Sequence, residues 1–304
     1  MQLSMILLNQ IELMFLLMGI GTLMYKRGFI SAQGSKELGA LLLYVVTPLV
    51  MIRAYSIEAT PERTFGLLVS LGLSVVAFSI SVLIAHLFFK NHRLEQFGTA
   101  FSNSGFIGIP LVLAALGNEA VFYLSAFLVL TSVAMWTYGI CLMTGSTKGL
   151  HIKKILSNPI IISAVVGLVI YAFRIPMPML FAKTLDAVAG LNTPLAMFVL
   201  GIYMAQLTFK EIFRFGIVYP SALLRLVIIP LLVLGVFMFV PAQFNIMKTT
   251  VLIAISAPSA ANVAIMAQQF HMDYTEGVKI VIVSTLFCIA TLPLIIQLSQ
   301  ILWQ

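Results

Sequence analysis

Charged side chains are scarce in this sequence. Asp, Glu, Lys and Arg make up 9% of its 304 residues, whereas soluble globular domains carry roughly 25%. So few charges cannot cover a water-soluble fold of this size, so most of the surface must face lipid. The basic residues behind the net charge of +7 are scattered between apolar runs and form no basic face, which excludes nucleic acid as a partner.

Cysteine and catalytic motifs are also scarce. Cys141 and Cys288 are the two cysteines, and their positions inside apolar runs indicate small core residues rather than a disulfide framework or a metal site. The sequence has no His-Glu-x-x-His motif, no midspan aspartate pair and no Gly-rich phosphate-binding loop. We therefore expect no enzyme, no metal, no cofactor and no ATP-driven transport by this chain alone.

Long uncharged runs are what the sequence has instead. Residues 64–89, for example, contain no Asp, Glu, Lys or Arg, and such a run crosses about 30 Å of hydrocarbon as a helix. Residues 3–25 have their basic residues after the apolar stretch, the wrong order for a cleaved signal peptide. The pattern predicts an all-α membrane protein with ten transmembrane helices, at residues 3–25, 37–55, 64–89, 94–116, 119–146, 155–173, 180–207, 212–240, 247–270 and 275–302.

The basic residues predict the orientation. Eleven of them fall on one side of the ten predicted spans and five on the other, while Arg225 lies within a span. Loops rich in Lys and Arg face the cytoplasm. We therefore expect a multi-pass protein of the cell membrane with both termini outside the cytoplasm. The eleven are Lys26, Arg27, Lys36, Lys90, Arg93, Lys148, Lys153, Lys154, Lys210, Arg214 and Lys279.

Three short motifs recur in the same order in the two halves of the chain. Residues 6–11 resemble 155–160 at an offset of 149, residues 47–51 resemble 193–197 at an offset of 146, and Ser102 falls opposite Ser256 at an offset of 154. The motifs predict two five-helix halves, residues 1–147 and 148–304. Because five is odd, the second half must insert upside down, and inverted repeats are typical of secondary transporters.

Small, polar and helix-breaking residues gather in the middle of the fourth and ninth predicted spans. Pro110 removes a helical hydrogen bond, so we expect a broken helix whose second half begins near Pro110. Two helix N-termini would then meet at the membrane centre and bind an anion. The alternative is a simple kink with polar side chains joining helices. The candidate binding residues are Asn103, Ser104, Gly105, Gly108, Pro110, Pro258, Ser259 and Asn262.

Arg225 is a further candidate, because a cation inside a membrane span needs a partner or a watery cavity. It would either attract the substrate, pair with Asp186 or Glu12, or extend its charge toward the interface. Neither expected break contains an Asp or Glu. A cation–proton antiporter needs such a carboxylate, so the predicted site favours an anion.

Several of these segments resemble the auxin efflux carrier family. The resemblance lies in residues 103–111 with Asn103 and Gly-Ile-Pro-Leu, in 157–161, in 196–205, and in Arg225 followed by Pro230. It implies ten spans in an inverted repeat. In that fold the fourth and ninth spans are broken and cross, and a carboxylate substrate binds where they cross. It also implies that one domain moves against a scaffold by an elevator mechanism. Asn103, Pro110 and Pro258 match the family's motif residues. A long central loop is lacking, which favours a bacterial-type organic-acid permease.

We therefore predict a secondary transporter of a small organic anion, a mono- or dicarboxylate such as malate or malonate, or an auxin-like acid. The alternative is an anion channel or a membrane sensor that uses the same crossing. The expected partners are the substrate and membrane lipid. The sequence leaves open whether a proton or a sodium ion is coupled to transport and whether the protein forms a homodimer. It also leaves open which acid is moved and in which direction.

Overall fold

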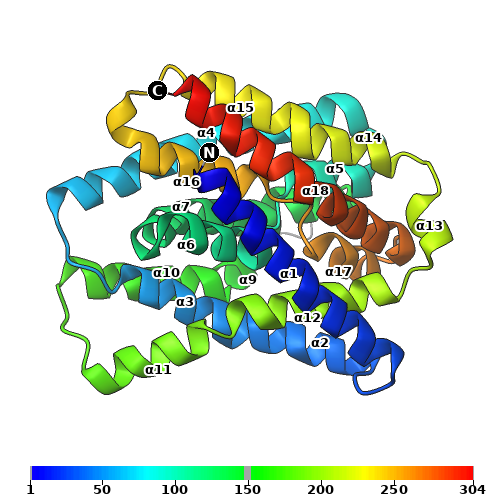
Figure 1. The fold of residues 1–304 in the computed structure, drawn as a ribbon, viewed down its shortest axis with the longest axis horizontal. Coiled ribbons are helices and arrows are strands. Elements are labelled where there is room, and N and C mark those ends of the chain that lie inside the picture. The colour runs from blue at the N-terminus through cyan, green and yellow to red at the C-terminus, as the bar shows by residue number, and fades with distance from the viewer. Residues whose placement is uncertain (1, 147–151, 304) are drawn as a thin grey trace.

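The computed structural model describes residues 2–146 and 152–303, and these residues form helices (Figure 1). Within the described ranges, the one strand-like contact is an isolated antiparallel bridge between Ser102 and Ser259. The predicted boundary between residues 147 and 148, and the topology charge Lys148, lie outside the described residues.

Seven helical segments are long and apolar enough to cross a membrane, which confirms an all-α membrane protein. Their outer faces carry large apolar side chains; Leu16, for instance, is 74% exposed, as expected where the solvent is lipid. The seven are Leu3–Lys26, Ala32–Tyr55, Pro61–Phe89, Asn118–Thr144, Met179–Ala205, Val218–Phe237 and Tyr274–Leu302.

Three of the seven are single α-helices: α1 (Gln2–Lys26), α4 (Pro61–Phe89) and α18 (Tyr274–Leu302). The others are built from consecutive pieces. They are α2 (Ala32–Leu41), η1 (Leu42–Val46) and α3 (Thr47–Tyr55); α7 (Asn118–Ala134), η3 (Met135–Gly139) and α8 (Ile140–Thr144); α11 (Met179–Ala189) and α12 (Asn192–Ala205); and α14 (Val218–Leu223), η5 (Leu224–Ile228) and α15 (Ile229–Phe237).

The other three predicted spans differ from these. Residues 155–173 contain α10 (Pro159–Ala172), a shorter apolar helix that follows α9 (Ile152–Leu156). Residues 94–116 and 247–270 are each interrupted. The first contains α5 (Arg93–Ala100), η2 (Ser104–Gly108) and α6 (Ile109–Leu116), and the second contains α16 (Asn245–Ser256) and α17 (Asn262–Gln269). Short connections are formed by α13 (Phe209–Phe213) and η6 (Ala242–Phe244).

Three prolines in the spans follow wide turns. The π-helical turns η1, η2 and η5 end directly before the dipeptides that contain Pro48, Pro110 and Pro230. A proline has no N–H and its ring collides with the carbonyl group one turn earlier, and a π turn removes both conflicts without ending the helix. Pro110 thus lies inside a continuous second half-helix, which begins at Ser104 and not near Pro110 as the sequence predicted.

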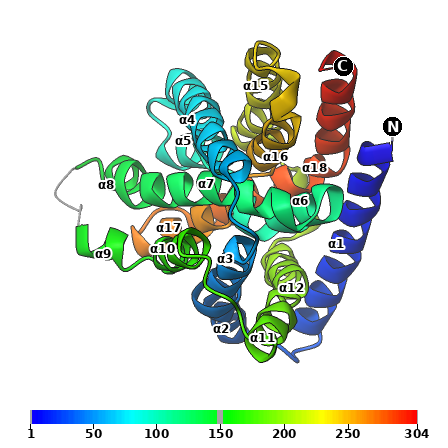
Figure 2. The same ribbon diagram turned by 90° about the vertical axis from the view of Figure 1, so that its left-hand side faces the viewer.

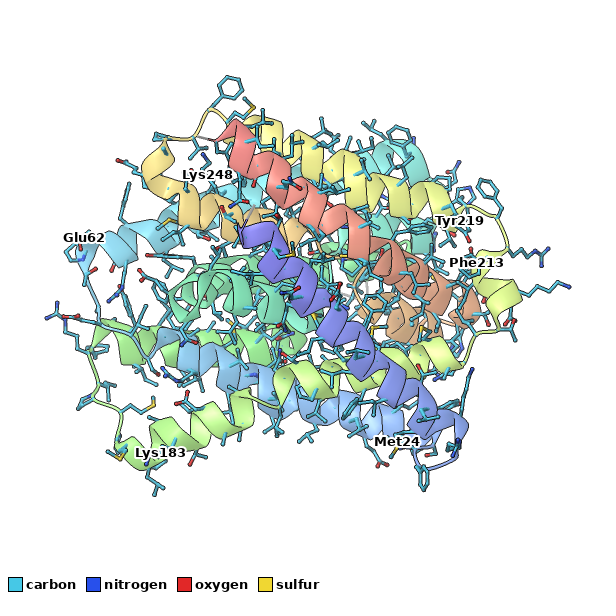
Figure 3. All side chains as sticks on the ribbon, in the orientation of Figure 1. Met24, Glu62, Lys183, Phe213, Tyr219 and Lys248 are labelled. Carbon is cyan, nitrogen blue, oxygen red and sulfur yellow. The ribbon has the colours of Figure 1, made fainter. Side chains whose placement is uncertain are left out.

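The loops divide between two ends of the molecule. In Figure 1 the α3–α4, α10–α11 and α15–α16 connections lie at the left end, and the α1–α2 and α12–α14 connections lie at the right end. Figure 3 places Glu62, Lys183 and Lys248 on the left and Met24, Phe213 and Tyr219 on the right. In the view from the left end, α6 and α7 lie between the helices above and those below (Figure 2). The second half of the fourth predicted span, which contains α6, therefore lies between the two groups of helices.

Candidate functional site

The two interrupted spans pair through their backbones where they cross. The amide N–H of Asn103 donates to the carbonyl oxygen of Pro258 at 2.7 Å, and that of Ala260 donates to Phe101 at 2.9 Å. Ser102 and Ser259 face each other between these bonds. Broken backbone away from water needs partners for its polar groups. Each break therefore supplies backbone partners to the other.

Arg225 lies beside this crossing and is fully buried. Its guanidinium group donates to the carbonyl oxygens of Thr99 and Ala100 at the end of α5, and to that of Ile255 at the end of α16. It also donates to the Ser81 hydroxyl at 2.9 Å. The last carbonyls of a helix have no intrahelical partner and carry partial negative charge. Arg225 therefore joins two helix C-termini.

A cavity of about 380 Å³ opens on the other side of the crossing. The starts of three helices line it: Ser104 and Gly105 begin the second half of the fourth span, Asn158 precedes α10, and Asn262 begins α17. The amide N–H groups of a first helical turn lack intrahelical acceptors, and the helix dipole is positive there. Among the described residues that line this cavity, none is charged.

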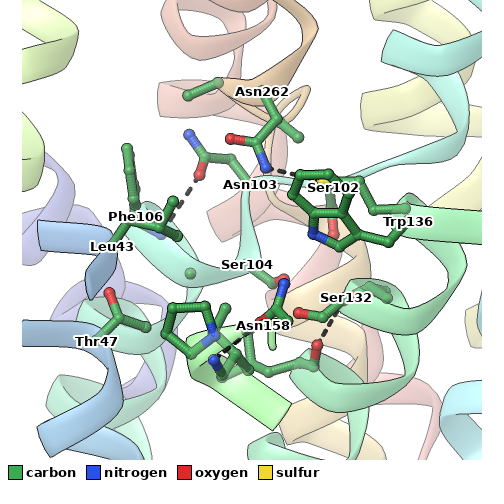
Figure 4. A pocket seen from close by; sticks show the side chains of 18 of the residues that line it. Leu43, Thr47, Ser102, Asn103, Ser104, Phe106, Ser132, Trp136, Asn158 and Asn262 are labelled. Carbon is green, nitrogen blue, oxygen red and sulfur yellow. Dashed lines mark hydrogen bonds between the residues drawn. The ribbon is translucent and has the colours of Figure 1, made fainter. Parts of the chain in front are cut away.

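Amide and hydroxyl side chains surround the same space (Figure 4). Asn103 is 5% exposed; its side-chain oxygen accepts from the Phe106 amide at 3.3 Å, while its NH₂ group has no partner among the described residues. Asn158 caps α10 by accepting from the Ile160 amide at 2.9 Å. The Asn262 NH₂ group contacts the Met135 sulfur at 2.8 Å. Asn103 thus lines the cavity and carries a buried NH₂ donor that has no partner among the described residues.

The structure brings together four of the predicted binding residues. Asn103, Ser104, Gly105 and Asn262 line the cavity. The remaining five are not among the described lining residues. Pro258 and Ser259 form the backbone crossing, Arg225 joins the helix C-termini, Gly108 packs toward Ala254, and Pro110 lines a different cavity.

Sequence reasoning assigned no binding role to several polar and aromatic residues that line the cavity. They come from the second, fourth, fifth and sixth predicted spans. The signal for one of them was present, because Asn158 stands directly before a proline, a strong helix-start pattern, and belongs to a repeated motif. The set comprises Tyr44, Thr47, Ser102, Thr131, Ser132, Trp136, Ser157 and Asn158.

This arrangement suits a small anion. Three positive helix ends and amide donors surround an uncharged space, and such ends bind anions without a fixed cation. The volume lies near the lower limit of small-molecule sites, which span roughly 300–1,000 Å³. Apolar neighbours such as Phe106 and Leu128 would contact a short carbon skeleton.

Known membrane transporters have sequences similar to this chain. The family model described as membrane transport protein matches residues 6–296. A Rhizobium meliloti protein named "Putative malonate transporter" is 24% identical over 280 residues, covering 86% of each chain. A transporter of Methanocaldococcus jannaschii is 21% identical over 88% of this chain and 90% of its own, and one of Methanothermobacter thermautotrophicus is 23% identical over 90% and 92%.

Proposed function

Because this chain belongs to the membrane transport protein family, the auxin efflux carrier family that its motifs resembled, we propose that it carries a small organic anion across the membrane. The cargo is a mono- or dicarboxylate. One observation carries the proposal: three helix N-termini and the unpaired NH₂ group of Asn103 meet at one uncharged cavity. The same groups offer hydrogen-bond donors to a carboxylate.

The chemistry of the cavity supports a carboxylate over a neutral solute. Carboxylate oxygens accept several hydrogen bonds at once, and charge-assisted bonds are about twice as strong as neutral ones. The Asn103 amide and the first-turn N–H groups of Ser104 and Gly105 supply donors from one element, and Asn158 and Asn262 bring further helix starts. Malonate, the cargo in the name of the relative from Rhizobium meliloti, is the first acid to test.

The transport mechanism is proposed to be alternating access of the elevator type. The halves 1–147 and 148–304 would form inverted repeats with five crossings each, and the interrupted spans would move with the bound anion. Two facts support this. The breaks fall in the fourth and ninth of the ten predicted spans, and they pair with each other through Asn103 and Pro258. The basic loops support a further proposal, that the right end in Figure 1 faces the cytoplasm and both termini lie outside.

Counterflow in proteoliposomes tests the function. Vesicles preloaded with unlabelled malonate are diluted into labelled malonate, and we expect transient, saturable accumulation that unlabelled dicarboxylates inhibit. Malonamide, which has a similar shape and no charge, should not compete. Competition by malonamide equal to that of malonate would contradict the anion assignment.

The same preparation separates the alternatives. A channel would pass current without saturation and without counterflow. A sensor would bind malonate, seen as a thermal shift, without any flux. Either result would overturn the carrier, whereas the absence of both binding and flux across a panel of carboxylates would overturn the substrate class.

A further inference from the structure

A second cavity, of about 280 Å³, lies further along the fourth span's second half-helix, beside Ile109, Pro110 and Leu113. Its wall is formed by α3, α6, α7, α11 and α12, which neighbour one another in Figures 1 and 2. Unlike the first cavity, it contains an ion pair, formed by Arg53 and Asp186. Pro110, Asn118 and Asn192 also line it.

The two cavities follow each other along the same helices. On the second span, Thr47 lines the first cavity and Arg53 lines the second cavity. On the fourth span, Gly105 lines the first cavity and Pro110 lines the second cavity. A helix rises about 1.5 Å per residue. The cavities are therefore separated by roughly one to two helical turns, on the order of 10 Å, in the direction of the end where the α3–α4 loop lies.

Asn192, which lines this second cavity, has a buried side chain without a hydrogen-bond partner among the described residues. It is 3% exposed, and neither its side-chain oxygen nor its NH₂ group has a partner among the described residues. It is the first residue of α12, so the positive end of that helix meets the same cavity. Buried polar groups without partners are rare in native structures and indicate a missing ligand or a second state.

Arg53 supplies the charge that the first cavity lacks. Its Nε–H donates to the Asp186 carboxylate, and both side chains are partly exposed. A guanidinium group binds carboxylates through two parallel N–H donors. A carboxylate that enters from the first cavity can therefore compete with Asp186 for the same cation.

Resting on the proposed function, we propose that this cavity is a second, transient carboxylate site on the transport path. Arg53 exchanges the Asp186 carboxylate for one carboxylate of the transported anion, and Asn192 together with the start of α12 contributes hydrogen-bond donors. When the anion leaves, Asp186 returns to Arg53. The site then closes without leaving an unpaired cation.

Paired measurements test the proposal: malonate counterflow in proteoliposomes and the malonate-induced thermal shift of the purified protein. We expect Arg53→Gln and Asn192→Ala to lower the counterflow rate at least fivefold, with the dissociation constant at the first cavity changed less than twofold. Arg174→Gln is the matched control, because Arg174 belongs to the α10–α11 connection and lines a different cavity. It should behave as the wild type.

The exchange itself is tested by Asp186→Asn, which frees Arg53. This change should lower the KM for malonate at least threefold, and the effect should vanish in the Arg53→Gln background, as expected for two residues that act on one another. A KM effect that persists without Arg53 would overturn the exchange. If Arg53→Gln does not fold, Asn192→Ala carries the test of the site, since it removes no charge.

The two possible failures give different results. Wild-type counterflow and binding in both Arg53→Gln and Asn192→Ala would overturn the second site and leave the proposed function standing. A wild-type protein without any carboxylate-induced shift or counterflow would overturn the proposed function itself.

Discussion

The guanidinium group of Arg225 donates a hydrogen bond to the backbone carbonyl oxygen of Thr99 at 2.9 Å. Through Ala100 and Ile255 the same group also reaches the ends of both interrupted helices. Its partners are helix C-termini, whereas the cavity is lined by helix N-termini. The cation therefore stabilises the negative ends of the crossing, and the positive ends remain available to an anion.

Replacing Arg225 should affect stability before it affects binding. Arg225→Leu leaves several buried carbonyl groups without partners and should destabilise the protein by about 3 kcal/mol or more. Arg225→Lys keeps the charge but lacks the planar fork that reaches two helix ends, so it should also lower the unfolding temperature in detergent. The folded fraction of Arg225→Lys should bind malonate within twofold of the wild type. A tenfold loss of affinity at unchanged stability would instead place Arg225 in the binding site.

Replacing Asn103 should have the opposite result. Asn103→Ala removes the free NH₂ donor, and a hydrogen bond to a charged group contributes about 1.5–3 kcal/mol, so affinity for malonate should fall roughly 10- to 100-fold. Asn103→Asp keeps a good helix cap but turns the donor into an anion, so it should abolish binding with little change in stability. Isothermal titration and thermal unfolding measure the two effects.

The control for Asn103 is Asn9→Ala, on an exposed position of α1, which should change neither affinity nor stability. Malonate binding by Asn103→Asp at wild-type strength would contradict an anion site beside this residue.

Pro110→Ala should leave the first cavity intact. The helix start is defined by Asn103 and Ser104, and Pro110 lines the second cavity. Alanine restores a backbone N–H, so the π turn η2 can relax while the break at residues 101–103 persists. We expect malonate affinity within twofold of the wild type in a thermal-shift titration. A loss as large as that of Asn103→Ala would show that the proline itself shapes the binding site.

The contact between α1 and α12 should tolerate no added methyl group. A Cβ atom at Gly201 would lie 2.1 Å from the carbonyl oxygen of Met18, and Thr22 donates to the Gly201 carbonyl at 2.8 Å. Such close helix packing depends on small residues. Gly201→Ala should therefore destabilise the protein by about 1–3 kcal/mol or more. Gly19→Ala, where a Cβ would meet nothing within 4 Å, is the control and should be neutral or slightly stabilising.

Several features followed from local sequence alone. The scarcity of charge and the length of the apolar runs predicted an all-α membrane protein, because hydrocarbon offers no partners to backbone polar groups. Small and polar residues in the fourth and ninth spans predicted breaks there, and both helices are interrupted. The motifs around Asn103 predicted the family that the comparison confirms. The inverted repeat and the membrane orientation stay predictions.

The sequence could not define where each break begins or what each polar group contacts. Pro110 looked like a helix start, yet a π turn absorbs it and the helix begins at Ser104. For Arg225 the sequence left open substrate attraction, an ion pair or a charge that reaches the interface, because a sequence does not reveal which backbone carbonyls approach a buried cation. Asn158 lines the cavity because the sixth predicted span packs close to the fourth, which a sequence does not reveal.

Composition and periodicity thus determined the solvent of this protein, its helical class and the positions at which its helices weaken, because these depend on a residue and its near neighbours. Tertiary structure decided which ends of the weakened helices meet, which charges are used for stability, and which donors remain free. Those outcomes depend on contacts between residues more than a hundred positions apart, such as Asn103 with Pro258 and Arg225 with Thr99, and no local pattern encodes them.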